Sequence, residues 1–93
     1  MVLSIEEIKN YFKEIFHLTA PEINFDMINL NLPLRDQIEI DSLDLYNIVV
    51  ALQKKTGVYI PDTTLAELTS LNELINYIFR KNENEGERNE LKL

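Results

Sequence analysis

The residues with the clearest chemical potential are an aspartate and a serine near the middle of the chain, Asp41 and Ser42. They stand where an irregular stretch gives way to a helical pattern. A serine at a helix start presents its hydroxyl outward, and the unpaired N–H groups and partial positive charge of that end favour an attached phosphate. The flanking acids, Asp44 among them, would attract a basic enzyme. This pattern predicts a serine that carries a covalent prosthetic arm; the simpler alternative is that Asp41 or Ser42 only caps the helix.

Other catalytic and metal chemistries find little support. The chain has no cysteine, and its two glycines, Gly57 and Gly86, cannot form a glycine-rich phosphate loop. The single histidine, His17, lies at an expected helix end, and no nucleophile-elbow sequence surrounds Ser42. The acids between residues 36 and 44 lack the glycine and final glutamate of a calcium-binding loop. The sequence therefore predicts no catalytic residue and no metal site.

Length and charge limit the class of protein. A chain of 93 residues with 45% hydrophobic residues is expected to form one small domain. Its net charge of −7 disfavours nucleic acid and anionic membranes and favours partners with basic patches. The N-terminus lacks the pattern of a signal peptide, and no apolar run is long enough to span a bilayer. We expect a soluble, cytoplasmic monomer without stable membrane insertion.

Helical spacing of apolar residues predicts two helices in the first part of the chain. Ser4 and Glu7 form a capping box for the first, which should end near residues 17–18. The second should run from Ser42 to Thr56, with Gly57 just beyond its end. Between them, too many apolar residues are present for a free linker, so an ordered loop over the core is expected.

The last part of the chain predicts two further helices. A short one is expected over residues 64–68, and a second capping box at Ser70 opens a final helix that ends near residues 80–81. The domain then covers residues 1–81, and the polar residues 82–93 are expected to form a disordered tail.

These elements predict an all-α fold, a small three- or four-helix bundle with a long ordered first loop. The predicted core takes apolar residues from every helix: Ile8, Phe12, Ile15, Ile48, Val49, Leu52, Leu65, Leu68, Leu74, Ile75 and Ile78.

The second helix has apolar residues on two sides. One side faces the predicted core, and Leu43, Tyr46 and Val50 lie on the other. A small helical domain buries one broad stripe of a helix, so part of this second side should stay exposed. Exposed apolar groups beside a reactive serine predict a docking surface for a partner.

The residues from Leu34 to Asp44, followed by Ala51 and Leu52 and by Ile-Pro-Asp at 60–62, resemble the acyl carrier proteins of fatty acid and polyketide synthesis. The match in motif order and spacing extends from about Leu34 to Ile78. An Asp-Ser-Leu sequence alone is weak evidence for this family. At a loop-to-helix junction, and with Ile-Pro-Asp at this spacing, it is a specific signal for the family.

The resemblance implies the chemistry of the site. A phosphopantetheinyl transferase would attach 4′-phosphopantetheine from coenzyme A to Ser42, with Asp41 helping the transferase recognise the site. The thiol of the arm would hold an acyl group as a thioester, and the carrier itself would catalyse nothing. Partner enzymes that load or use acyl groups, with basic docking patches, would bind residues at and beyond the serine: Leu43, Asp44, Tyr46, Asn47 and Val50.

Some positions depart from the family's usual pattern. Glu39 stands where the family usually has glycine, and Asn47 and residues 53–55 (Gln-Lys-Lys) stand where it usually has glutamates. The second helix is therefore less acidic than in a housekeeping carrier of fatty acid synthesis. This difference predicts a specialised carrier with its own partners.

Two alternatives remain open. A D-alanyl carrier or a peptidyl or aminoacyl carrier has the same fold, although peptidyl carriers usually have glycines before the serine and no adjacent aspartate. The second alternative is a helical interaction module without any modification.

Overall fold

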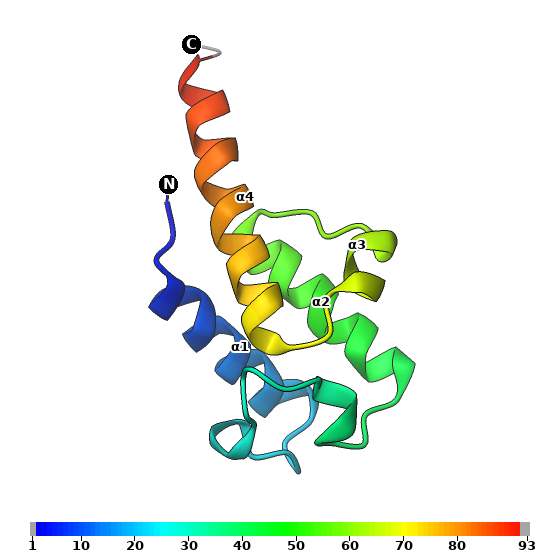
Figure 1. Ribbon diagram of the computed structural model, residues 1–93. Helices are drawn as coiled ribbons and strands as arrows, with labels where there is room; N and C mark the ends of the chain where they lie inside the picture. Colours follow the sequence, from blue (N-terminus) through cyan, green and yellow to red (C-terminus); the bar gives the residue numbers. More distant parts are fainter. Residues whose placement is uncertain (1, 92–93) are drawn as a thin grey trace.

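Helices form the body of the protein (Figure 1). The computed structural model describes residues 2–91 and the side chains of residues 2–83. Three long helices and one short helix follow one another along the chain: α1 (Ile5–Thr19), α2 (Ser42–Thr56), α3 (Asp62–Glu67) and α4 (Leu71–Leu91). Across the described residues, the one β-type pairing is an isolated bridge between Pro33 and Ser70. The all-α bundle expected from the sequence is confirmed.

The first helix begins at the predicted capping box. The Ser4 hydroxyl accepts a hydrogen bond from the Glu7 N–H, and the Glu7 carboxylate accepts one from the Ser4 N–H, both at 3.1 Å. This exchange satisfies backbone donors that a helix start otherwise leaves unpaired. Ile8 and Phe12 are four residues apart, so their side chains lie on the same face of α1. Both are fully buried.

The core lies where α1 packs against α2 and α4. Its largest completely buried side chains come from all three long helices and from the segment after α2: Phe12, Phe16, Ile8, Ile48, Leu52, Ile75, Ile78 and Val58. Leu65 and Leu68, which the sequence placed in the core, are only half-buried. Helix α3 spans six residues, none of them buried, so it covers the edge of the core instead of contributing to its centre.

The long segment between α1 and α2 is ordered, as expected. It contains two short 3₁₀ turns, η1 (Phe25–Met27) and η2 (Leu34–Asp36). Phe25 and Leu34 are both buried, and the ring of Phe25 packs against that of Phe16 with centroids 5.6 Å apart. Apolar anchors on both turns therefore hold the segment against the bundle.

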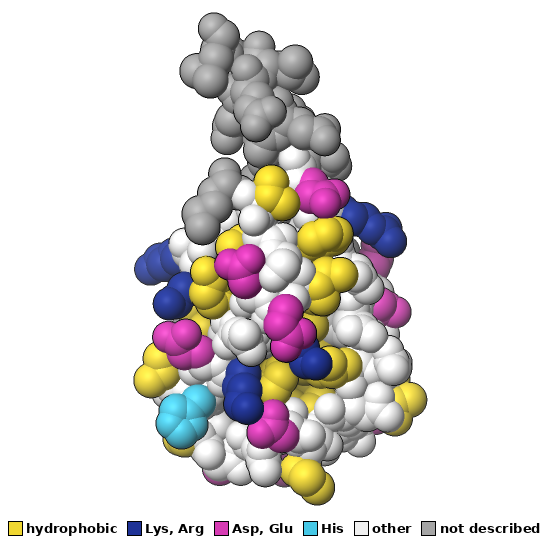
Figure 2. Space-filling model, turned by 90° about the vertical axis from the view of Figure 1, so that its left-hand side faces the viewer, with side chains coloured by type: hydrophobic (Ala, Val, Ile, Leu, Met, Phe, Trp, Pro, Cys, Tyr) yellow, Lys and Arg dark blue, Asp and Glu magenta, His cyan; other side chains and the backbone are white. Residues whose placement is uncertain are grey.

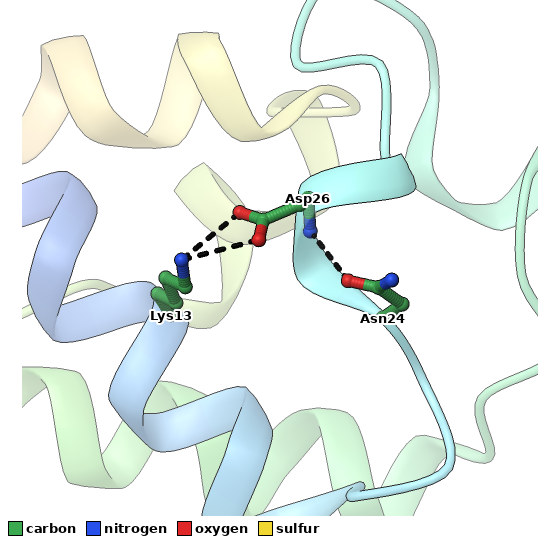
Figure 3. A network of polar contacts seen from close by, with 3 residues as sticks. All are labelled: Lys13, Asn24 and Asp26. Atoms are coloured by element: carbon green, nitrogen blue, oxygen red, sulfur yellow. Dashed lines mark hydrogen bonds and ion pairs between the residues drawn. The ribbon is translucent and has the colours of Figure 1, made fainter.

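Polar contacts add to these anchors. Lys13 on α1 forms an ion pair with Asp26 at 3.1 Å, and the Asp26 N–H donates to the Asn24 side chain (Figure 3). Further along, the Gln37 side chain accepts from the Asn29 N–H at 2.7 Å and donates to the Asn29 carbonyl at 2.8 Å. The Gln37 amide thus replaces part of the regular backbone bonding that this loop lacks.

The last helix is longer than the sequence predicted. It was expected to end near residues 80–81, but it continues to Leu91. Asn82 is 8% exposed; its side-chain oxygen accepts from the Leu3 N–H at 2.7 Å, and its amide nitrogen donates to the Thr56 carbonyl at 3.5 Å. The expected helix end near Lys81 is therefore too early, because Asn82 is buried against the rest of the protein. The domain boundary at residue 81 and the disorder expected of residues 82–93 stay predictions. Residues 92–93 of that tail lie outside the described residues.

No helix within residues 2–91 combines the length and the apolar character that crossing a bilayer requires.

Candidate functional site

Helix α2 begins with an aspartate cap. The Asp41 carboxylate accepts a hydrogen bond from the Asp44 N–H at 2.9 Å, and the Asp41 carbonyl accepts from the Leu45 N–H at 3.1 Å. Asp41 has extended backbone geometry, as an N-cap residue requires. Ser42 is therefore the first helical residue, not the cap. Of the two capping alternatives that the sequence left open, the structure selects Asp41, and the Ser42 side chain is left for another role.

A comparison of the three serines shows how Ser42 differs. The Ser4 hydroxyl accepts from the Glu7 N–H, and the hydroxyl of the buried Ser70 accepts from the Glu73 N–H at 3.2 Å. Both of these serines cap helices. The Ser42 side chain is exposed and makes no hydrogen bond to any described residue. Among the three serines, Ser42 is the one whose hydroxyl is exposed and makes no hydrogen bond to the described residues.

A shallow groove of about 570 Å³ opens beside this hydroxyl. Its lining comes from the end of the loop and the first turns of α2: Arg35, Ile38, Glu39, Ile40, Asp41, Ser42 and Leu45. Ile38, Ile40 and Leu45 are half-buried and pack against the core, so they present apolar surface to the groove. The structure therefore places a cation and three apolar side chains next to the serine.

Sequence reasoning did not identify Arg35 or Ile40 as part of the site, because the loop that brings them there has no regular period. One feature of the sequence could have pointed to Arg35: it is the single lysine or arginine between Lys13 and Lys54.

The outer face of α2 extends away from Ser42. Leu43 is 67% exposed and Tyr46 is 58% exposed, while Asn47 is exposed and Val50 is half-buried. Their spacing of three, four and seven residues places all four on one side of the helix, which we call the outer stripe. Asp44 is half-buried beside its hydrogen bond to Asp41. The predicted partial exposure of Leu43, Tyr46 and Val50 is confirmed.

The far end of α2 carries two lysines in different settings. The Lys55 ammonium lies 3.5 Å from the Glu14 carboxylate and 5.5 Å from the centre of the Tyr11 ring, so it joins α2 to α1. Lys54 is exposed and lies eleven residues after Leu43, close to three full turns along the same side of the helix. The outer stripe therefore has Asp41 and Asp44 near its first residue and the exposed Lys54 beyond its last residue.

A second cavity of about 500 Å³ lies on another face, between α1 and the loop that follows it. Figure 2 shows this face, with charged side chains around apolar ones. Lys13, His17 and Phe25 are among its lining residues, and none of the lining residues is a serine. His17 is exposed in the last turn of α1, where the dipole of the helix favours a positive charge. This cavity is separate from the groove at Ser42 and offers no comparable attachment group.

The class of protein follows from comparison with known families. A family model described as "Phosphopantetheine attachment site" matches residues 6–78, which extend from α1 into α4 and include the whole site. The fold and the match together define a domain that carries phosphopantetheine.

Individual relatives narrow the class. An acyl carrier protein homolog of Mycoplasma genitalium is 36% identical over 73 residues, covering 78% of this chain and 86% of the relative. An acyl carrier protein of Acidothermus cellulolyticus is 33% identical over 78 residues, covering 84% of this chain and 92% of the relative. One from Treponema denticola is 35% identical over 69 residues, with coverage of 72% and 88%. The chain belongs to the acyl carrier protein family, and its role is that of a phosphopantetheine-bearing acyl carrier.

Proposed function

We propose that Ser42 is the residue that carries the phosphopantetheine arm and that Asp41 helps the transferase recognise it. The observation that carries this proposal is the contrast among the serines: Ser4 and Ser70 cap helices, and Ser42 is exposed without a hydrogen bond to the described residues. Its position at the first residue of α2 adds the field of the helix N-terminus, which stabilises the negative charge of a phosphate.

The surroundings of Ser42 fit such an arm. The hydroxyl is accessible, and the groove beside it offers apolar surface from Ile38, Ile40 and Leu45 together with the Arg35 guanidinium. The arm supplies a terminal thiol, which holds an acyl group as a thioester. The residues of this chain anchor the arm and present it to partner enzymes; none of them acts on the thioester.

The loading reaction makes one bond and breaks one bond. The Ser42 oxygen bonds to the phosphorus that carries the pantetheine, and the bond from this phosphorus to the bridging oxygen of coenzyme A's pyrophosphate breaks. Adenosine 3′,5′-bisphosphate leaves, and the serine proton passes to a base of the transferase. No base is hydrogen-bonded to Ser42 among the described residues, and we assign that base to the transferase.

The outer stripe is the surface that we assign to partner enzymes. Leu43, Tyr46, Asn47 and Val50 continue along α2 from the attachment residue, and Asp44 adds a negative charge beside them. Exposed apolar and aromatic groups next to an acid suit a partner with an apolar pocket and a basic rim. Enzymes that load or use acyl groups would therefore meet the arm and the stripe together.

Intact mass measurement tests the attachment residue. The parent chain is incubated with coenzyme A and a phosphopantetheinyl transferase, and its mass should rise by one phosphopantetheinyl group. Ser42→Ala should show no increase and should keep the parent's stability, since the hydroxyl makes no hydrogen bond to the described residues. Ser4→Ala is the matched control, which should still be modified. Modification of Ser42→Ala, or no modification of the parent with several transferases, would contradict the proposal; the second outcome is the one that a helical interaction module without modification predicts.

The cargo and the partners are a finer part of the proposal. Asn47 and Lys54 make the exposed side of α2 less acidic than we expect for a housekeeping carrier of fatty acid synthesis. Enzymes that bind carriers through acidic residues at these positions should therefore bind this chain weakly. We expect a specialised carrier that housekeeping fatty acid synthase enzymes acylate or elongate slowly. Turnover equal to that of a housekeeping carrier would contradict this part alone.

Mass spectrometry of the protein from its native host would identify the cargo. An acyl thioester is expected, whereas an alanyl or peptidyl group would support the alternative carriers. A cytoplasmic location and a monomeric state stay predictions.

A further inference from the structure

Arg35 occupies an unusual electrostatic position. It is the single lysine or arginine in the sequence between Lys13 and Lys54, and it lines the groove that opens at Ser42. The same region holds four acids, at positions 36, 39, 41 and 44. A phosphodiester on Ser42 would add a further negative charge to this cluster. One nearby cation would offset the added repulsion, and Arg35 is the one cation among the residues that line the groove.

The Arg35 guanidinium is available for such a contact. The side chain is exposed, and among the described residues it takes part in neither of the ion pairs, which join Lys13 to Asp26 and Lys55 to Glu14. Guanidinium groups bind phosphate oxygens through two parallel N–H bonds, which an ammonium group cannot match.

The backbone that carries Arg35 is well anchored. Leu34 is buried, and its N–H donates to the Thr69 carbonyl at 2.9 Å. On the other side, the Gln37 N–H donates to the Leu34 carbonyl at 3.0 Å, and the Gln37 side chain binds the Asn29 backbone. The guanidinium therefore extends from a fixed turn at the rim of the groove, and little backbone order would have to be gained when it binds.

We propose that Arg35 binds the phosphate of the arm on Ser42 and so directs the first part of the arm into the groove over Ile38, Ile40 and Leu45. This inference rests on the proposed function, because it needs an arm on Ser42. It adds a role that the attachment itself does not require: the arm would rest against the carrier when no partner is bound. Arg35 acts here as a positioning residue, and a partner enzyme would draw the arm out of the groove by offering better contacts.

Nuclear magnetic resonance of the loaded protein tests the inference. The parent, Arg35→Gln, Arg35→Lys and Arg80→Gln are loaded with the arm, and intact mass confirms loading. Arg80 is exposed on α4, so Arg80→Gln is a matched control that removes one positive charge elsewhere. Two quantities are measured: the ³¹P shift of the phosphodiester, relative to the same arm on a short unfolded peptide, and nuclear Overhauser contacts from the arm's methyl groups to Ile38, Ile40 and Leu45.

The parent should show a ³¹P shift distinct from the peptide value and contacts to all three groove residues. Arg35→Gln should return the shift to the peptide value and lose the contacts, Arg35→Lys should be intermediate, and Arg80→Gln should match the parent. Added salt should move the parent toward the peptide value, because an exposed ion pair is screened. Identical spectra for the parent and Arg35→Gln would overturn the inference while leaving the proposed function intact. Failure of the parent to load at all would overturn both.

Discussion

The two ends of α2 use their polar groups in opposite ways. At the first end, a single carboxylate, that of Asp41, caps the helix through the Asp44 N–H. The next two side chains, Ser42 and Leu43, are exposed. One cap is enough to begin the helix, and it leaves the following turn free for an attached group and a partner.

At the second end, polar groups are bonded within the fold. The Gly57 N–H donates to the Gln53 carbonyl at 2.9 Å, and the Gln53 side chain accepts from the Ile60 N–H at 2.8 Å. The buried Thr56 hydroxyl donates to the Leu52 carbonyl at 2.7 Å. Gly57 has a φ of 74°, a left-handed conformation that favours glycine. Helix α2 is therefore stabilised mainly at the end and on the side that lie away from Ser42.

The largest expected difference is between two leucines of the same helix. Leu52→Ala removes a side chain with 0% exposure and should lower the free energy of unfolding by about 2–5 kcal/mol. Leu43→Ala removes one that is 67% exposed and should change it by no more than about 0.5 kcal/mol. Urea unfolding of both variants measures the difference.

The two leucines should also differ in partner binding. Leu43→Ala should raise the KM of the transferase for the carrier, whereas folded Leu52→Ala, at a temperature below its Tm, should be loaded with the parent's KM. Equal destabilisation by the two substitutions would show that the outer stripe contributes to the core after all.

A smaller effect is expected where α4 meets the second end of α2. Asn82→Ala removes the acceptor of the Leu3 N–H and the donor to the Thr56 carbonyl, and it leaves two buried backbone groups without those partners. The expected loss in the free energy of unfolding is about 1–3 kcal/mol. Asn76→Ala, on the exposed side of the same helix, is the control and should change stability by no more than about 0.5 kcal/mol.

Both asparagine variants should still accept the arm at the parent's rate, because Asn82 contacts residues away from Ser42. If Asn82→Ala is loaded more slowly than the parent under conditions where it is fully folded, the second end of α2 affects the loading of Ser42, which would contradict the expected independence of the two ends of this helix.

Features set by neighbouring residues were predictable from the sequence. The Ser4–Glu7 capping box, the end of α2 before Gly57 and the two-sided character of α2 all depend on residues a few positions apart, and all three are confirmed. Features set by distant residues were not predictable. Asn82 finds its partner 79 positions away, at Leu3, and its polar side chain alone favoured an exposed tail.

The candidate site also has one feature that neighbouring residues determine and one that distant residues determine. The expected position of Ser42 at the start of α2 follows from local helix signals and is confirmed, although its role as the attachment residue stays a proposal. The groove depends on where the loop carries Arg35, Ile38 and Ile40, and this path is determined by buried residues such as Leu34 and by the Gln37 hydrogen bonds. Irregular segments have no period from which such a path could be derived.

A small predicted change in stability at Asp41 is the most informative about the first end of α2, because Asp41 is proposed to have two roles there, as the cap and in recognition by the transferase. Asp41→Asn keeps a side-chain oxygen that can accept from the Asp44 N–H, so the free energy of unfolding should change by only a few tenths of a kcal/mol. Asp41→Ala removes the cap and should cost about 1 kcal/mol. Both variants lose the negative charge, so both should reduce kcat/KM of the transferase by a similar factor, measured by the rate of mass increase. If Asp41→Asn is loaded as fast as the parent, the carboxylate serves only to cap α2, and recognition by the transferase must depend on other residues of the first turn, such as Leu43 and Asp44.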